Sequence, residues 1–178
     1  MPLKESPKDQ LPSILQTASN LVYHPLGYQI NNLQIEGESQ EYAACTFELE
    51  EVKIKHRLSK VTPTKTGQFV TIWKRNQAGI TTPFNDQDQF DLLIISARNA
   101  TQFGQFIFPK EILVQHKIIT KNEIVGKRGI RIYTPWDTVT NKQAEKSQQW
   151  QAPYFLQIEI NGNTDLAKAK ELIGNRIK

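Results

Sequence analysis

The sequence has few of the features that mark secreted or membrane-embedded proteins. It has one cysteine, Cys45, which cannot form a disulfide within the chain and fits a reducing compartment. No apolar stretch approaches the ~18 residues needed to cross a bilayer. Residues 1–10 hold four charged side chains with no apolar segment after them, unlike a signal peptide. We therefore expect a cytoplasmic protein without membrane association.

Size and composition are those of an ordinary globular protein. The chain has 178 residues, of which 38% are hydrophobic and 22% charged. A chain of this length can bury a sizeable core without disulfides or a structural metal. We therefore predict one domain over residues 1–178.

The charge is unevenly distributed along the chain, although the net charge is only +4. Residues 1–52 hold two lysines and eight acids, a balance of −6, whereas residues 53–85 hold seven bases and no acid. Residues 98–150 hold nine bases and four acids, a balance of +5. If the two basic segments share one face, that face would attract a polyanion. Alternatively, neighbouring strands pair acidic with basic segments and cancel the charge.

Hydrophobic periodicity indicates both helices and strands. Spacings of three and four predict a helix at residues 11–21. Pro109 suits a helix start, residues 141–150 lack Gly and Pro and are rich in helix-forming residues, and residues 166–173 run into Gly174, so we expect three further helices there. Alternating or β-rich runs predict strands at residues 42–49, 52–58, 69–73, 90–97, 105–108, 129–133 and 155–160. Residues 28–35 could form a short strand or an irregular segment. The pattern predicts an α+β protein with a central mixed sheet flanked by helices.

Three segments combine basic, hydroxyl and aromatic side chains. Residues 57–75 carry Lys and Arg beside several threonines and Trp73, which could bind phosphates and stack a base. Residues 126–137 place bases between glycines that would let the backbone approach a ligand. On the third segment, Lys142, Lys146 and Trp150 share a helix face, although Trp150 could equally be a core residue. The alternative interpretation is that these segments are solvent-exposed hairpins and helix faces without a ligand, because such surfaces have the same composition.

Signals for catalysis by metal or nucleophile are weak in this sequence. His24, His56, His116 and Cys45 stand singly, without the paired spacing of a metal site, and we expect them to be structural. No motif of a catalytic serine or cysteine surrounds Ser59, Ser96 or Cys45. We therefore predict neither a metal site nor a cofactor.

The three segments resemble the MepB-like family, named from a protein encoded beside a multidrug efflux pump in a bacterial operon. The resemblance spans most of residues 42–155. It is carried by KVTPTKTGQFVTIWKR at residues 60–75, FGQFIFPK at 103–110, GKRGIR at 126–131, PWD at 135–137 and NKQA at 141–144. The resemblance implies a restriction-endonuclease-like fold that lacks the catalytic carboxylates.

The sequence can be compared with the nuclease pattern that this resemblance implies. Nucleases of that shape place an acid-x-Lys triplet on a strand, where carboxylates hold Mg²⁺. Here the triplet position reads Leu58-Ser59-Lys60, and leucine cannot bind a hard cation. Half of the metal site is then absent. A Mg²⁺-dependent nuclease using Glu48 with Lys60 remains the alternative.

From these observations we predict a protein that binds nucleic acid, DNA in preference to RNA, without a complete catalytic site. A non-enzymatic accessory protein that binds a partner protein or a small ligand is a further alternative. The predicted binding residues are Lys60, Lys65, Trp73, Lys74, Arg75, Lys127, Arg128, Arg131, Trp136 and Lys142, with Trp73 and Trp136 as stacking partners.

Overall fold

A computed structural model describes residues 10–177. Its centre is a six-stranded sheet in which β3 and β8 are parallel and all other neighbours are antiparallel. The order across the sheet is β1 (Ile30–Ile35), β2 (Cys45–Leu49), β3 (Val52–Leu58), β8 (Leu92–Arg98), β9 (Phe103–Pro109) and β11 (Phe155–Ile158). The predicted α+β class with a central mixed sheet flanked by helices is confirmed.

The two faces of this sheet carry separate hydrophobic cores. Along β8, Leu92 and Ile94 point to one core, whereas Leu93 and Ile95 point to the other, as the period of two in a strand requires. Residues on both faces of β8 are fully buried, so β8 is the central strand that its apolar sequence predicts.

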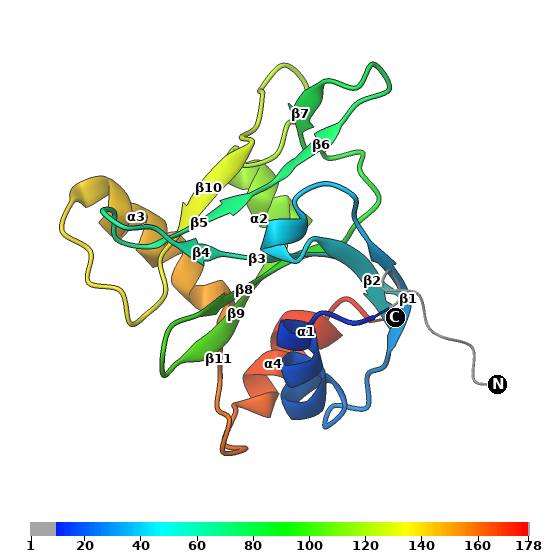
Figure 1. Cartoon of the computed structure of the whole chain (residues 1–178), viewed down its shortest axis with the longest axis vertical. Coiled ribbons are helices and arrows are strands. Elements are labelled where there is room, and N and C mark those ends of the chain that lie inside the picture. The colour runs from blue at the N-terminus through cyan, green and yellow to red at the C-terminus, as the bar shows by residue number, and fades with distance from the viewer. Residues whose placement is uncertain (1–9, 178) are drawn as a thin grey trace.

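Helices cover the first face of the sheet (Figure 1). These are α1 (Ser13–Ala18), which continues as a π-helical turn over Ser19–Tyr23, and α4 (Leu166–Gly174). Pro12 precedes α1, so the predicted first helix begins two residues later and ends two residues further on. No helix within residues 10–177 is both long and apolar enough to span a membrane.

The second face is covered by α2 (Lys110–Gln115) and by a three-stranded sheet. This smaller sheet has the order β10 (Gly129–Ile132), β5 (Gln68–Thr71) and β4 (Lys60–Val61). The prediction of one strand over residues 69–73 is wrong, because β5 ends at Thr71. After the buried Ile72, the chain pairs instead as the hairpin of β6 (Trp73–Arg75) with β7 (Thr81–Pro83).

A row of polar side chains is buried under the first face. Tyr23 donates a hydrogen bond to Gln105 (2.9 Å), and Gln105 donates to the Ser96 hydroxyl (3.0 Å), which lies 2.9 Å from His56 Nε2. Burial lowers the pKa of His56 to about 4, so the ring is neutral near pH 7. Burial also raises the pKa of Cys45 to about 12. The predicted structural role of His56 and Cys45 agrees with these contacts.

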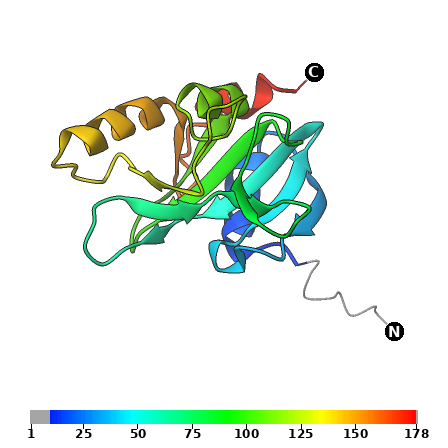
Figure 2. The ribbon, with the colours of Figure 1, turned by 90° about the horizontal axis from the view of Figure 1, so that it is seen from above.

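Two glutamines attach the helix α3 (Lys142–Gln151) to the end of β10 and to the turn that follows it. The Gln151 amide accepts from Tyr133 N (2.8 Å) and donates to the Arg131 carbonyl (3.1 Å), as a neighbouring strand would. Gln148 donates to the carbonyls of Thr134 and Asp137. Figures 1 and 2 show α3 on the same side of the molecule as the β4–β5 hairpin, with β10 between them.

Candidate functional site

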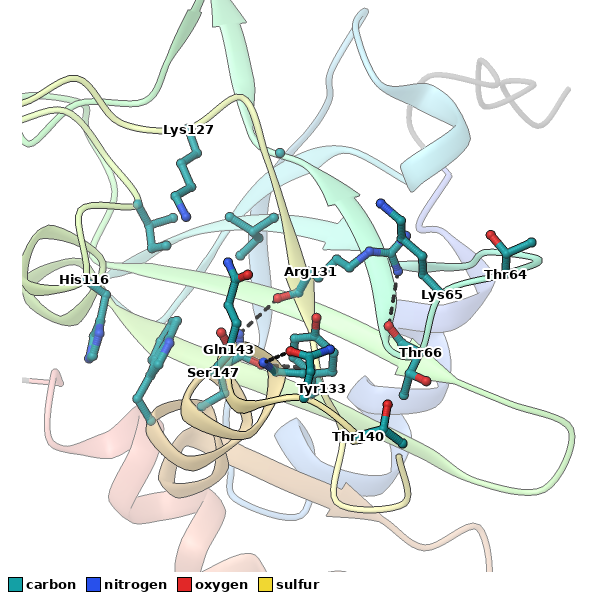
Figure 3. A pocket seen from close by; sticks show the side chains of 17 residues that line it. Thr64, Lys65, Thr66, His116, Lys127, Arg131, Tyr133, Thr140, Gln143 and Ser147 are labelled. Carbon is teal, nitrogen blue, oxygen red and sulfur yellow. Dashed lines mark hydrogen bonds between the residues drawn. The ribbon is translucent and has the colours of Figure 1, made fainter. Parts of the chain in front are cut away.

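A cavity of about 620 Å³ lies where the edge of β10, the β4–β5 hairpin and α3 meet (Figure 3). Its walls come from four parts of the chain that are distant in sequence. They are formed by residues 64–66 of the β4–β5 loop, by His116 and Ile118 after α2, by residues 129–131 of β10 with Lys127 before and Tyr133 after the strand, and by Thr140 and Asn141 before α3 with Gln143, Ala144, Ser147, Trp150 and Gln151 of α3.

The charge of the lining has one sign. Lys65, Lys127 and Arg131 contribute three cations, and none of the residues that line the cavity is an aspartate or a glutamate. Figure 3 shows Lys65 and Arg131 at one side, and Lys127 at another, above His116. Bases brought together from two distant segments therefore give the cavity a positive potential, which favours an anionic ligand.

Arg131 also holds the hairpin loop against β10. Its guanidinium donates to the Thr62 hydroxyl (2.9 Å) and to the carbonyls of Thr66 and Gly67 (3.4 Å each). These acceptors are neutral, so the positive charge of Arg131 is not cancelled by them. The residue therefore serves both the loop conformation and the potential of the cavity.

Lys60 and Lys142 do not line the cavity but lie on elements that border it, and the Lys60 Nζ atom lies 4.4 Å from the centre of the Tyr42 ring. Lys60 pairs with Phe69, and Phe69 pairs with Arg131, so the three residues lie in one row across the smaller sheet. Neighbouring strands place Lys60 and Arg131 roughly 10 Å apart at their Cα atoms, on the same face. Lys142 is exposed at the first residue of α3, directly after the cavity residue Asn141.

The remaining predicted bases lie around the β6–β7 hairpin and have other partners. Lys74 forms an ion pair with Asp88, and Arg75 forms one with Glu38. Arg128 donates to the Thr81 carbonyl (2.9 Å). These three residues, predicted to bind nucleic acid together with the others, do not line the cavity.

The two predicted stacking residues also lie outside the cavity. Trp73 is half-buried and packs under the Arg75 guanidinium, 5.4 Å from its ring centre. Trp136 packs edge-on against Phe155 (5.4 Å between centroids) as part of the second core. In the same turn, Asp137 accepts hydrogen bonds from the amide and hydroxyl of Thr134. The Pro-Trp-Asp segment therefore builds the turn that leads to α3.

Comparison with known proteins agrees with the resemblance seen in the sequence. The MepB-like family model matches residues 36–157. This chain belongs to the MepB-like family. The crystal structure of MepB is 38% identical to it, with a TM-score of 0.70 over 72% of this chain and 86% of that one. The structure of a bacterial homing endonuclease matches with 13% identity and a TM-score of 0.46, over 81% of this chain and 90% of that one. A search of curated proteins found no match.

All residues that line the cavity fall within the region of the chain that matches the MepB-like family. The family region includes most of the central sheet and the whole of the smaller sheet, but neither α1 nor α4. The cavity therefore belongs to the part of the fold that defines the family.

The glycines of the Gly126–Gly129 segment make room for protein atoms in this MepB-like chain. A Cβ at Gly126 would lie 2.6 Å from the Ile118 carbonyl oxygen, and one at Gly129 would lie 2.5 Å from the Phe69 ring. The prediction that these glycines let the backbone approach a ligand is therefore corrected. They allow β10 and the preceding loop to pack closely against their neighbours.

Glu48 and Lys60 are not brought together. Glu48 pairs with Lys53 across the β2–β3 hairpin, and its carboxylate accepts a hydrogen bond from Asn32 (2.9 Å). Lys60 lies seven residues beyond Lys53, up to roughly 23 Å along an extended chain. Within residues 10–177, no three His, Cys, Asp or Glu side chains are grouped as a metal site requires. The geometry does not support a nuclease centre built from Glu48 and Lys60.

Sequence reasoning missed the aromatic wall of the cavity. His116, predicted to be only structural, stacks on Trp150 with ring centroids 4.1 Å apart and an angle of 14° between planes. Burial lowers the pKa of His116, which favours a neutral ring near pH 7. His116 and Trp150 are 34 positions apart in the sequence, so only the packing of α3 against α2 brings them together.

Proposed function

We propose that this MepB-like protein binds nucleic acid, with DNA preferred, and that the phosphate backbone contacts the cations of the cavity. Lys65, Lys127 and Arg131 would make the central contacts. Lys60 and Lys142 would extend them to neighbouring phosphates. Lysine and arginine give charge-assisted hydrogen bonds to phosphate oxygens, and the threonines beside Lys65 can add neutral ones.

The observation that carries this proposal is a concave lining with three bases and no acid. In the most basic segment of the sequence, by contrast, more than half of the bases are paired with acids. Of the seven bases in residues 53–85, four form ion pairs with acids: Lys55 and Arg57 with Glu36, Lys74 with Asp88, and Arg75 with Glu38. Because the fold neutralises these bases, the concentration of unneutralised charge at the cavity points to an anionic ligand there.

The proposal includes binding without cleavage, in a cytoplasmic protein. Metal-dependent cleavage of a phosphodiester needs carboxylates that hold the metal beside the phosphate. The residues that line this cavity offer hydroxyls, amides and cations instead. This chemistry fits a polyanion that is held and released unchanged.

A salt series tests the proposal. Binding of labelled single-stranded and duplex oligonucleotides is followed by fluorescence anisotropy, for the full chain and for Lys65→Ala/Lys127→Ala. Each lost phosphate contact should reduce the slope of log Kd against log salt by about 1, so the double variant should lose about 2. Arg131 is left intact because it also holds the hairpin loop.

Three comparisons complete this test. Lys53→Ala/Lys170→Ala removes the same charge from exposed positions outside the cavity, and should leave the slope unchanged. A parallel reaction with Mg²⁺, resolved on a gel, should show intact oligonucleotide. Cleavage there would favour the nuclease, and no binding at low salt would favour the accessory protein.

A further inference from the structure

The cavity has two chemically different sides. Figure 3 shows Lys65, Thr64 and Thr66 at one side and His116 at the other, with Gln143 and Ser147 of α3 between them. The first side offers charge and hydroxyls. The second offers the stacked pair His116–Trp150 together with Ile118, with Lys127 above His116. A ligand that fills the cavity therefore needs an anionic part and a flat apolar part.

The His116–Trp150 pair is built as a firm aromatic surface. Trp150 is supported by Phe108, with centroids 5.3 Å apart, and His116 follows α2 directly. Both rings are only half-buried, although Phe108 beneath them is fully buried. Since Trp150 also packs against the second core, its position is fixed before any ligand arrives. Flat aromatic surfaces of this kind are what nucleic-acid bases stack on.

The polar residues between the two sides suit the edge of a base or a sugar. Among the described residues, the side chains of Gln143 and Ser147 have no hydrogen-bond partner within the protein. An amide and a hydroxyl can each donate and accept, so they can bind different bases. Their position on α3 holds them between the cations and the aromatic pair.

We propose that the cavity takes one unpaired nucleotide of a single strand, with its base against His116–Trp150 and its phosphate at Lys65 and Arg131, while Lys127 lies above His116 on the side of the base. This inference rests on the proposed function and assigns the side chains that contact the base. A base inside a duplex is stacked between its neighbours and cannot reach an aromatic wall unless it is extruded. The cavity volume of about 620 Å³ lies in the range of pockets that hold a small molecule.

The test separates stacking from charge by using strands with equal numbers of phosphates. The full chain is titrated with a labelled oligo-dT strand, with the same length of abasic strand, and with the corresponding dT–dA duplex. An RNA strand is measured in parallel. Loss of base stacking should weaken binding of the abasic strand by roughly 5- to 100-fold. The duplex should bind more weakly than the dT strand at equal salt.

His116→Ala then locates the stacked base. It should weaken binding of the dT strand and leave binding of the abasic strand unchanged. His24→Ala, an exposed histidine near the end of the first helical segment, is the matched control and should affect neither. The comparison of the dT strand with the abasic strand uses the wild-type protein alone, so it tests whether the base contributes to binding even if His116→Ala folds poorly.

The outcomes distinguish this inference from the proposed function. If the abasic strand or the duplex binds as tightly as the dT strand, base insertion is overturned, whereas backbone binding at the cavity stands. If none of the strands binds at low salt, both proposals are overturned.

Discussion

The ion pair between Glu36 and Arg57 is expected to be a large single electrostatic contribution to stability. Arg57 is fully buried on β3, and its guanidinium donates to both carboxylate oxygens of Glu36 (3.2 and 2.8 Å). It also donates to the His56 carbonyl (2.8 Å) and lies over the Phe84 ring, 5.5 Å from its centre. Replacing Glu36 by the isosteric glutamine leaves this buried cation without a counter-charge.

The expected cost of Glu36→Gln is roughly 3 kcal/mol, because removing one partner of a buried ion pair typically costs roughly 3–5 kcal/mol. The lower end applies because the Glu36 side chain is 21% exposed and glutamine can still accept a hydrogen bond. With a urea m-value of about 2 kcal/mol per molar, the unfolding midpoint should fall by roughly 1.5 M.

A second variant, at an exposed ion pair, tests whether the cost of losing the charge depends on burial. Glu111 makes a similar two-oxygen contact with Arg176, but these side chains are 66% and 31% exposed. Glu111→Gln should therefore cost roughly 1 kcal/mol or less. Glu36→Gln/Arg57→Met, which removes both charges, should recover much of the loss. Equal midpoints for Glu36→Gln and Glu111→Gln would refute the reasoning.

The pH dependence of this variant follows from the pKa of Glu36. Burial raises that pKa, but the charge and hydrogen bonds of Arg57, together with Lys55, outweigh burial and hold it below its ordinary value. The contribution of the carboxylate is therefore complete above the unfolded pKa of about 4.3 and is lost as the pH falls below it. The difference between wild type and Glu36→Gln should shrink in the same window.

Three further predictions concern the buried framework. His56 has a folded pKa of about 4 and an unfolded pKa of about 6.5. The free energy of unfolding should therefore fall by roughly 3 kcal/mol as the pH drops from the higher to the lower value. In His56→Gln, the urea midpoint should not show this dependence on pH. Gly104→Ala would place a Cβ 2.2 Å from the Phe155 ring and 2.6 Å from the Leu156 carbonyl oxygen, so thermal unfolding should show a loss of roughly 1–3 kcal/mol or more. Gln151→Ala removes the hydrogen bonds to Tyr133 N and to the Arg131 carbonyl and should cost roughly 1–3 kcal/mol. Hydrogen exchange at the Tyr133 amide should become faster; unchanged exchange would argue against a role of Gln151 in holding α3 to β10.

Much of the central sheet could be predicted because its strands have clear local patterns. The alternation predicted over 42–49 and 52–58 and the doubly apolar run predicted at 90–97 correspond to β2, β3 and β8, with differences of up to three residues at their ends. In the smaller sheet, β10 corresponds to the strand predicted at 129–133, but β4 and the end of β5 could not be predicted in this way. β4 has only two residues, and the β5 pattern continues through the buried Ile72 into Trp73. Only tertiary pairing with β10 shows where β5 ends.

The location of the candidate site could not be predicted from the charge pattern of the sequence either. A basic run such as residues 53–85 records how many cations are present, but the topology decides which of them meet an acid. Antiparallel pairing of β2 with β3, together with the segment after β1, brings Glu36 to Lys55 and Arg57, and the β6–β7 hairpin brings Arg75 to Glu38. Lys65 is placed in a hairpin loop, and β10 brings Lys127 and Arg131 to it from another basic segment. The sequence therefore shows how many cations are available for an anionic ligand, whereas the location of the candidate site depends on which of them the fold brings to one cavity without an acid.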